Sequence, residues 1–85
     1  MPSEMRIKPV KYSISEYLKR HQLERKFQKA KELLEQSMNH PSLNVELLEP
    51  KHLKVYSFRI DKKYRAIFVL TGHEIEIITV TNHYR

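Results

Sequence analysis

YSFRIDKKYRAIFVLTGHEIEIITVT, residues 56–81, is the stretch that decides the fold of this chain. It contains three runs rich in β-branched and aromatic residues, which is the composition of β-strands. Short polar segments that are typical of turns separate these runs. The first run, residues 54–60, begins two residues before this stretch, the other runs are residues 64–70 and 74–80, and the turns are residues 61–63 and 71–73. The stretch therefore predicts an antiparallel meander of three strands.

The alternation of side chains along the first two runs predicts their register, because successive side chains in a strand point to opposite faces. A three-residue loop at 61–63 places Phe58 opposite Ala66 and gathers the bulky residues on one core face. The same register places Arg59 opposite Arg65 on the other, open face. Neighbouring like charges on a sheet repel each other, at a cost of up to about 1 kcal/mol. We therefore expect either an anion between the two arginines or a separate carboxylate for each.

The third run changes the phase of its apolar pattern between Ile77 and Ile78. A regular ladder through this point would turn Val80 outward and His83 into the core. A β-bulge, which adds one residue to a strand, restores the alternation. We therefore predict a bulge between Ile77 and Val80, with Ile78 and Val80 facing inward. Thr81 and His83 then join the two arginines on the open face.

The first half of the chain predicts a strand followed by two helices. Residues 5–13 are expected to form the strand, and Ser13 with Glu16 makes a capping-box pattern that starts a short helix. Apolar residues at helical spacing predict a second helix over residues 23–38, and the following Asn39-His40-Pro41 prevents it from continuing. Its other face is charged and solvated, and the basic part of that face is open to an acidic partner. Together with three or four antiparallel strands, this order predicts an α+β fold.

The length and composition limit the class of protein. Eighty-five residues make one small domain, expected to span residues 1–85. The opening residues lack the apolar segment of a signal peptide, and the longest apolar run, residues 66–70, is too short to cross a bilayer. Without cysteine there is no disulfide and no thiolate metal site. These features predict a soluble cytoplasmic protein without a membrane partner.

The net charge and the spacing of the histidines indicate which kinds of ligand the chain can bind. The net charge of +6 favours an anionic partner, such as nucleic acid or an acidic protein. The 5 histidines do not have the spacing of a zinc-binding pair, and a glycine-rich phosphate loop is absent from the sequence. We therefore expect neither a metal nor a cofactor.

Several features of residues 46–84 occur together in a fixed order. They are the run Tyr56-Ser57-Phe58-Arg59-Ile60, the pair Tyr64-Arg65 before apolar residues, the closing His83-Tyr84, and the spacing from Glu46 through Arg65 to His83. This ordered set resembles the RelE/ParE superfamily of bacterial toxins, and most closely its YoeB-like branch of mRNA endonucleases. The resemblance implies a RelE-like fold with an N-terminal strand, a two-helix hairpin and a three- to four-stranded antiparallel sheet.

The resemblance also implies an activity. The chain would be the toxin of a type II toxin–antitoxin pair, a ribosome-dependent endoribonuclease that inhibits translation without a metal ion. In this chemistry the 2′-hydroxyl of an mRNA nucleotide attacks the neighbouring phosphate, and the 5′-oxygen leaves. By resemblance, Glu46 is the general base, Arg65 stabilises the phosphorane and His83 is the general acid. Tyr84 places the substrate, and Arg59 supports the phosphate.

Glutamate and histidine suit the roles of general base and general acid, because one group must take a proton and another must return one. A guanidinium supplies charge and paired donors to the phosphate oxygens. The choice of base stays open: the branch often carries Glu-Pro, which here is Glu49-Pro50, whereas the spacing to the strand selects Glu46. Lys51 and Lys54 are expected either to contact RNA or the ribosome, or to be solvated in a loop. Arg85 is expected to replace an arginine that the branch carries where Thr81 stands here.

The implied partners are a cognate antitoxin, the ribosome with its mRNA, and operator DNA bound through the antitoxin complex. Two other readings stay open, because a fold can host several functions. The chain is then either a gyrase inhibitor of the ParE kind or an inactive homologue that only binds an antitoxin.

Overall fold

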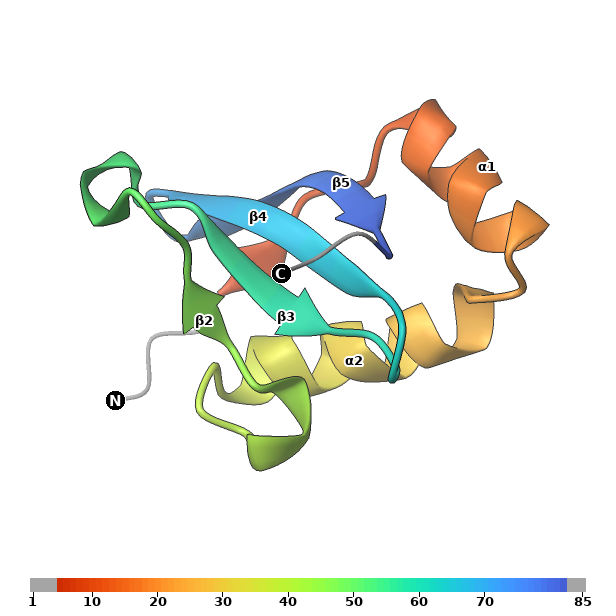
Figure 1. Cartoon of the computed structure of the whole chain (residues 1–85), viewed down its shortest axis with the longest axis horizontal. Helices are drawn as coiled ribbons and strands as arrows, with labels where there is room; N and C mark the ends of the chain where they lie inside the picture. Colours follow the sequence, from red (N-terminus) through yellow and green to blue (C-terminus); the bar gives the residue numbers. More distant parts are fainter. Residues whose placement is uncertain (1–4, 83–85) are drawn as a thin grey trace.

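The computed structural model describes residues 5–82 of the chain. Its elements, in chain order, are β1 (Arg6–Ile7), α1 (Tyr12–Arg20), α2 (Glu24–Gln36), the 3₁₀ helix η1 (Pro41–Leu43), β2 (Glu46–Leu47), the 3₁₀ helix η2 (Lys51–Leu53), β3 (Tyr56–Arg59), β4 (Arg65–Thr71) and β5 (Glu74–Thr81). The strands form one five-stranded sheet in the order β1-β5-β4-β3-β2. Helix α2 runs beneath the sheet, and α1 lies at one end, near β5 (Figure 1).

The predicted α+β fold is confirmed, with a larger sheet than the sequence suggested. Strand β1 joins one edge of the meander parallel to β5, and β2 joins the other edge antiparallel to β3. A parallel neighbour requires a crossover between strands. Here α1 and α2 lie between β1 and the meander in the chain, so the helices are part of that crossover.

Both predicted helices are present, but the first begins differently. Helix α1 starts at Tyr12, and its N-cap is Lys11, whose side chain makes no capping hydrogen bond. The expected capping box at Ser13 is therefore wrong. The first turn is closed by the backbone instead, because the amides of Ile14 and Ser15 both donate to the carbonyl of Lys11. Helix α2 ends at Gln36, two residues before the predicted end.

The register of β3 and β4 is the predicted one. Phe58 pairs with Ala66 and Arg59 pairs with Arg65. Phe58, Ala66 and Phe68 are fully buried and form the centre of the core beneath the sheet. The side chains on the opposite face of these two strands therefore include Ser57, Arg59 and Arg65, as the alternation requires.

The predicted bulge lies at Ile78. Phe68 pairs with Ile77 while Ile67 pairs with Thr79, so Ile78 is the extra residue. Beyond it Val80 is 5% exposed and faces the core as expected, but Ile78 is 40% exposed, and its expected inward orientation is wrong. In a bulge two successive residues stand against one residue of the partner strand. Ile78 and its neighbour Thr79 are both exposed, and the inward alternation resumes only at Val80.

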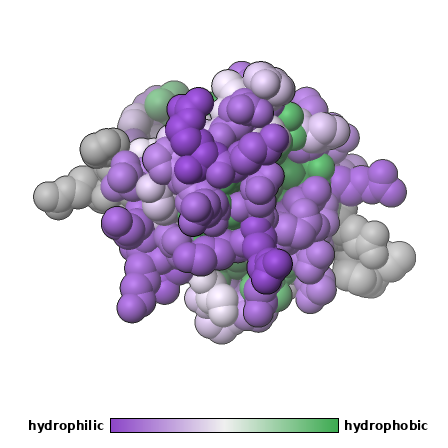
Figure 2. Space-filling view, turned by 90° about the vertical axis from the view of Figure 1, so that its right-hand side faces the viewer, coloured by the Kyte–Doolittle hydropathy of each residue, from purple (hydrophilic) through white to green (hydrophobic). Residues whose placement is uncertain are grey.

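The face of the molecule on the side of α1 is largely polar (Figure 2). Figure 2 views the molecule from the end at which α1 lies, and most of that surface is hydrophilic with small hydrophobic patches. Neither helix between residues 5 and 82 has the length and the apolar stretch that crossing a bilayer requires.

Candidate functional site

The centre of the candidate site is Arg65, the first residue of β4, which is 7% exposed. Its guanidinium lies across β3. The Nε atom donates to Ser57 Oγ at 2.9 Å, and Nη2 donates to the Ser57 carbonyl at 3.3 Å. A further hydrogen bond joins Nη2 to the carbonyl of Asn44. The side chain is thus held by a hydroxyl and by backbone carbonyls in one orientation.

The electrostatics of Arg65 reflect its surroundings. Burial lowers the pKa of its guanidinium, and the positive charge of Arg59 lowers it further, while the carboxylate of Glu46 acts in the opposite direction. The ordinary pKa of arginine is so high that the group stays charged at any physiological pH. A charged guanidinium therefore sits in a partly dehydrated place, where its interaction with an anion is stronger than in water.

Glu46 opens β2 and pairs directly with Ser57, so its side chain lies on the same face of the sheet as Arg65. Its Oε2 atom lies 3.4 Å from Nδ2 of Asn44. Glu49 is exposed and lies beyond the end of β2, where the amide of Leu48 donates to the carbonyl of Val55. The structure therefore brings Glu46, rather than Glu49, towards the arginine.

Three residues form a row across the sheet on this face. Arg59 on β3 pairs with Arg65 on β4, and Arg65 pairs with Thr81 on β5. Between residues 5 and 82 no ion pair involves Arg59. The row therefore presents two adjacent guanidinium groups beside a threonine, with one carboxylate near the buried arginine.

The remaining predicted residues lie elsewhere. Lys51 and Lys54 are exposed and belong to η2 and its C-cap, which precede β3. Arg59 is at the other end of that strand, so the loop lies at the far end of the sheet from the row (Figure 1). The predicted site residues His83, Tyr84 and Arg85 lie outside the described residues, and Thr81 is the last strand residue before them.

The sequence reasoning missed Asn44 and Ser57 as parts of this site. Ser57 is fully buried and polar. A serine between two aromatic residues of the strand, on the face of the arginines, was the available signal. Asn44 follows η1 with φ 45° and ψ 56°, the left-handed conformation. Asparagine adopts this conformation more readily than most residues, but its carbonyl contact with a residue 21 positions away has no sequence signature.

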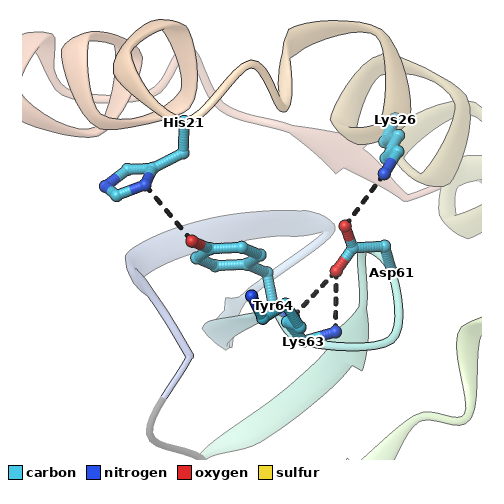
Figure 3. A network of polar contacts seen from close by, with 5 residues as sticks. All are labelled: His21, Lys26, Asp61, Lys63 and Tyr64. Atoms are coloured by element: carbon cyan, nitrogen blue, oxygen red, sulfur yellow. Dashed lines mark hydrogen bonds and ion pairs between the residues drawn. The ribbon is translucent and has the colours of Figure 1, made fainter.

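A polar network supports the turn that leads into Arg65 (Figure 3). Asp61 Oδ1 accepts the amides of Lys63 at 2.8 Å and Tyr64 at 2.9 Å, and Asp61 Oδ2 pairs with Lys26 Nζ of α2 at 3.1 Å. The Tyr64 hydroxyl lies 3.2 Å from His21 Nδ1 at the end of α1. Both helices thus hold the segment immediately before the buried arginine.

These contacts also set the ionisation of the aspartate. Burial alone raises the pKa of Asp61, but the two amide hydrogen bonds and the charge of Lys26 outweigh burial and hold the pKa below its ordinary value. Within residues 5–82 no group of three or more histidine, aspartate or glutamate side chains is arranged to hold a metal ion.

Comparisons with known proteins place the fold. No protein-family model matches the chain. An uncharacterized protein of Haemophilus influenzae is 40% identical over 43 residues, which are 51% of this chain and 43% of that protein. The chain thus aligns with less than half of that relative's length.

Solved structures match over nearly the whole chain. A YoeB dimer from Staphylococcus aureus has a TM-score of 0.70 at 17% identity, covering 95% of this chain and 97% of its own. A YoeB/ParE toxin from Agrobacterium tumefaciens has a TM-score of 0.70 at 16% identity, covering 95% and 99%. A heterotetrameric YoeB-YefM toxin-antitoxin complex from Staphylococcus aureus has a TM-score of 0.64 at 17% identity, covering 99% and 100%. The fold is therefore the YoeB-like fold that the RelE/ParE resemblance implies.

Proposed function

We propose that this protein, whose fold is that of the YoeB and ParE toxins, is the toxin of a type II toxin–antitoxin pair and cleaves ribosome-bound mRNA without a metal ion. One observation carries the proposal: Glu46, Arg59 and Arg65 share one face of the sheet in a row that leads to Thr81. The chain continues from there to His83, two residues further on. A base, two cations and an acid are the groups that this reaction requires.

In the proposed reaction Glu46 takes the proton from the 2′-hydroxyl of a nucleotide. The 2′-oxygen attacks the adjacent phosphorus, the bond from phosphorus to the 5′-oxygen breaks, and His83 gives that oxygen a proton. The products are a 2′,3′-cyclic phosphate and a 5′-hydroxyl. Tyr84 places the nucleotide next to these groups.

The hydrogen bonds that hold Arg65 in place favour its role as the group that stabilises the phosphorane. The hydrogen bonds to Ser57 and Asn44 already fix its guanidinium, so little reorganisation is needed when charge develops on the phosphate. Arg59 is exposed beside it and adds a second positive charge for the phosphate. Lys51, Lys54 and Arg85 then contact RNA or ribosome further from the reacting bond, and such contacts weaken as salt increases.

The partner of such a toxin is a cognate antitoxin, in line with the YoeB-YefM complex that shares this fold. The positive net charge suits an acidic antitoxin as well as mRNA and the ribosome. The complex of toxin and antitoxin would act in the cytoplasm and bind operator DNA through the antitoxin.

The test is brief induced expression of the wild-type chain and of two matched variants, Glu46→Gln and Glu49→Gln. We expect the wild type to arrest translation and to leave cuts in ribosome-bound mRNA, read by primer extension. Loss of the general base in Glu46→Gln should lower cleavage by about 10²-fold or more, whereas Glu49→Gln should keep it.

Other outcomes contradict the proposal in distinct ways. If Glu49→Gln is inactive and Glu46→Gln is active, Glu46 is not the base. Signs of DNA damage without mRNA cuts indicate a gyrase inhibitor. A folded wild-type chain without any effect on growth indicates an inactive homologue that only binds an antitoxin.

A further inference from the structure

Asn44 contacts two of the groups on which the proposed reaction depends. Its carbonyl accepts a hydrogen bond from Arg65 Nη2, and its side-chain Nδ2 lies 3.4 Å from Glu46 Oε2. The backbone of one residue therefore holds the cation, and its side chain holds the carboxylate.

The local backbone makes this double contact specific to few residue types. Asn44 is the C-cap of η1 and has φ 45° and ψ 56°. Glycine, asparagine and aspartate adopt this left-handed conformation more readily than other residues do. The chain turns there from η1 into β2, which begins two residues later at Glu46.

We propose that Asn44 is a positioning residue that sets Glu46 and Arg65 relative to each other. The inference rests on the proposed function and adds to it a residue that touches neither RNA nor the reacting atoms. Reactions of this kind depend on the placement of the base, and an error of 1 Å can cost about 10²-fold in rate.

The side-chain contact of Asn44 leaves one oxygen of Glu46 for the reaction. Nδ2 of Asn44 lies beside Oε2 of Glu46. A carboxylate has two oxygens, so Oε1 of Glu46 serves as the acceptor for the 2′-hydroxyl.

Two substitutions separate the side chain of Asn44 from its backbone. Asn44→Gly keeps the left-handed turn and the carbonyl that binds Arg65, and removes only the amide beside Glu46. We expect kcat to fall about tenfold with KM and thermal stability unchanged, because the base is less well placed. Asn44→Asp also keeps the turn but replaces the donor by a second carboxylate, so we expect a larger loss of kcat than in Asn44→Gly.

Gln22→Gly is the matched control. Gln22 is exposed, lies in the turn after α1 and has φ 57°, so it is replaced by glycine at a similarly positive φ away from the site. Its kcat should equal that of the wild type. Cleavage of ribosome-bound mRNA is measured at several substrate concentrations, with unfolding followed in parallel for each variant.

A second measurement separates this inference from the proposed function. The ¹³C signal of the Glu46 carboxylate in the NMR spectrum should shift in Asn44→Gly and stay in place in Gln22→Gly, whether or not the chain cleaves RNA. An active wild type with full kcat in Asn44→Gly, or a Glu46 signal that does not move, overturns the role of Asn44 and leaves the proposed function intact. A wild type that cuts no mRNA overturns the proposed function, and with it the catalytic role of Asn44, while the shift of the Glu46 signal still decides the contact.

Discussion

At the scale of single residues, the notable feature is that Arg65 is buried. Side-chain alternation placed it on an open face, but the segment before β2 adds a backbone carbonyl from Asn44 beside it. Taking a charge out of water is costly, and the cost is offset only where the charge is well hydrogen-bonded. Ser57 contributes both its hydroxyl and its carbonyl to Arg65. The serine is therefore as much a part of the site as the arginine.

Ser57→Ala is predicted to destabilise the protein and to weaken catalysis. It removes the acceptor of Arg65 Nε inside the protein, which should cost about 1–3 kcal/mol in the free energy of unfolding. Cleavage should fall as the guanidinium loses its fixed orientation. Urea unfolding of this variant and of Ser42→Ala, a change at an exposed serine, measures the effect. Equal unfolding free energies for the two variants would show that the Ser57 hydroxyl does not hold Arg65.

At the scale of the elements, the bulge in β5 decides which of its residues face the core and which face Arg65. The bulge at Ile78 brings Val80 into the core and sets Thr81 against Arg65. The change of phase in the sequence was enough to predict that a residue would be added to the strand. The change of phase did not predict which side chain would face solvent. That depends on how the two residues of the bulge share the space opposite Ile67.

The substitutions Ile78→Thr and Val80→Thr are predicted to lower the free energy of unfolding by unequal amounts. Val80 is 5% exposed, so Val80→Thr buries a hydroxyl and should cost about 1–3 kcal/mol. Ile78 is 40% exposed, so Ile78→Thr should stay within about 0.5 kcal/mol of the wild type. Chemical denaturation of both variants gives the comparison. A larger loss for Ile78→Thr would place Ile78 in the core and contradict the observed bulge.

At the scale of the whole molecule, the helices and the sheet are joined at the turn before Arg65. Asp61 holds the turn by accepting hydrogen bonds from the backbone amides of Lys63 and Tyr64, and it holds α2 through Lys26 (Figure 3). The aromatic rings of Tyr17, His21 and Tyr64 pack together at the same place, with centroids 4.2 to 6.2 Å apart. The position of the site thus depends on the helical layer as well as on the sheet.

The amide hydrogen bonds to Asp61 from Lys63 and Tyr64, together with its pairing with Lys26, are predicted to make part of the stability depend on pH. Folding lowers the pKa of Asp61, so the carboxylate stabilises the fold at pH above its unfolded value and this contribution is lost as the pH falls through the folded value. Asp61→Asn keeps an oxygen for the turn but loses the charge. It should cost about 0.2–1 kcal/mol near pH 7, because Lys26 is largely exposed.

Unfolding of the wild type and Asp61→Asn across pH measures this contribution. The gap between them should close as the pH falls through the folded-state pKa of Asp61, because the carboxyl is then protonated in both states. Asp61→Ala also removes the acceptor for the turn, so it should be less stable than Asp61→Asn at every pH. A gap that is constant from neutral to acidic pH would contradict the role of the charge.

The sequence by itself determined the α+β order, the register that places Arg59 against Arg65, and the presence of a bulge in the last strand. These features depend on periodicities of a few residues, which can be read from neighbouring positions. The tertiary structure alone decided that β1 joins the sheet in parallel and that the carbonyl of Asn44 holds Arg65. Such contacts join residues that are far apart in the chain and depend on the path of the loops, which no local pattern encodes.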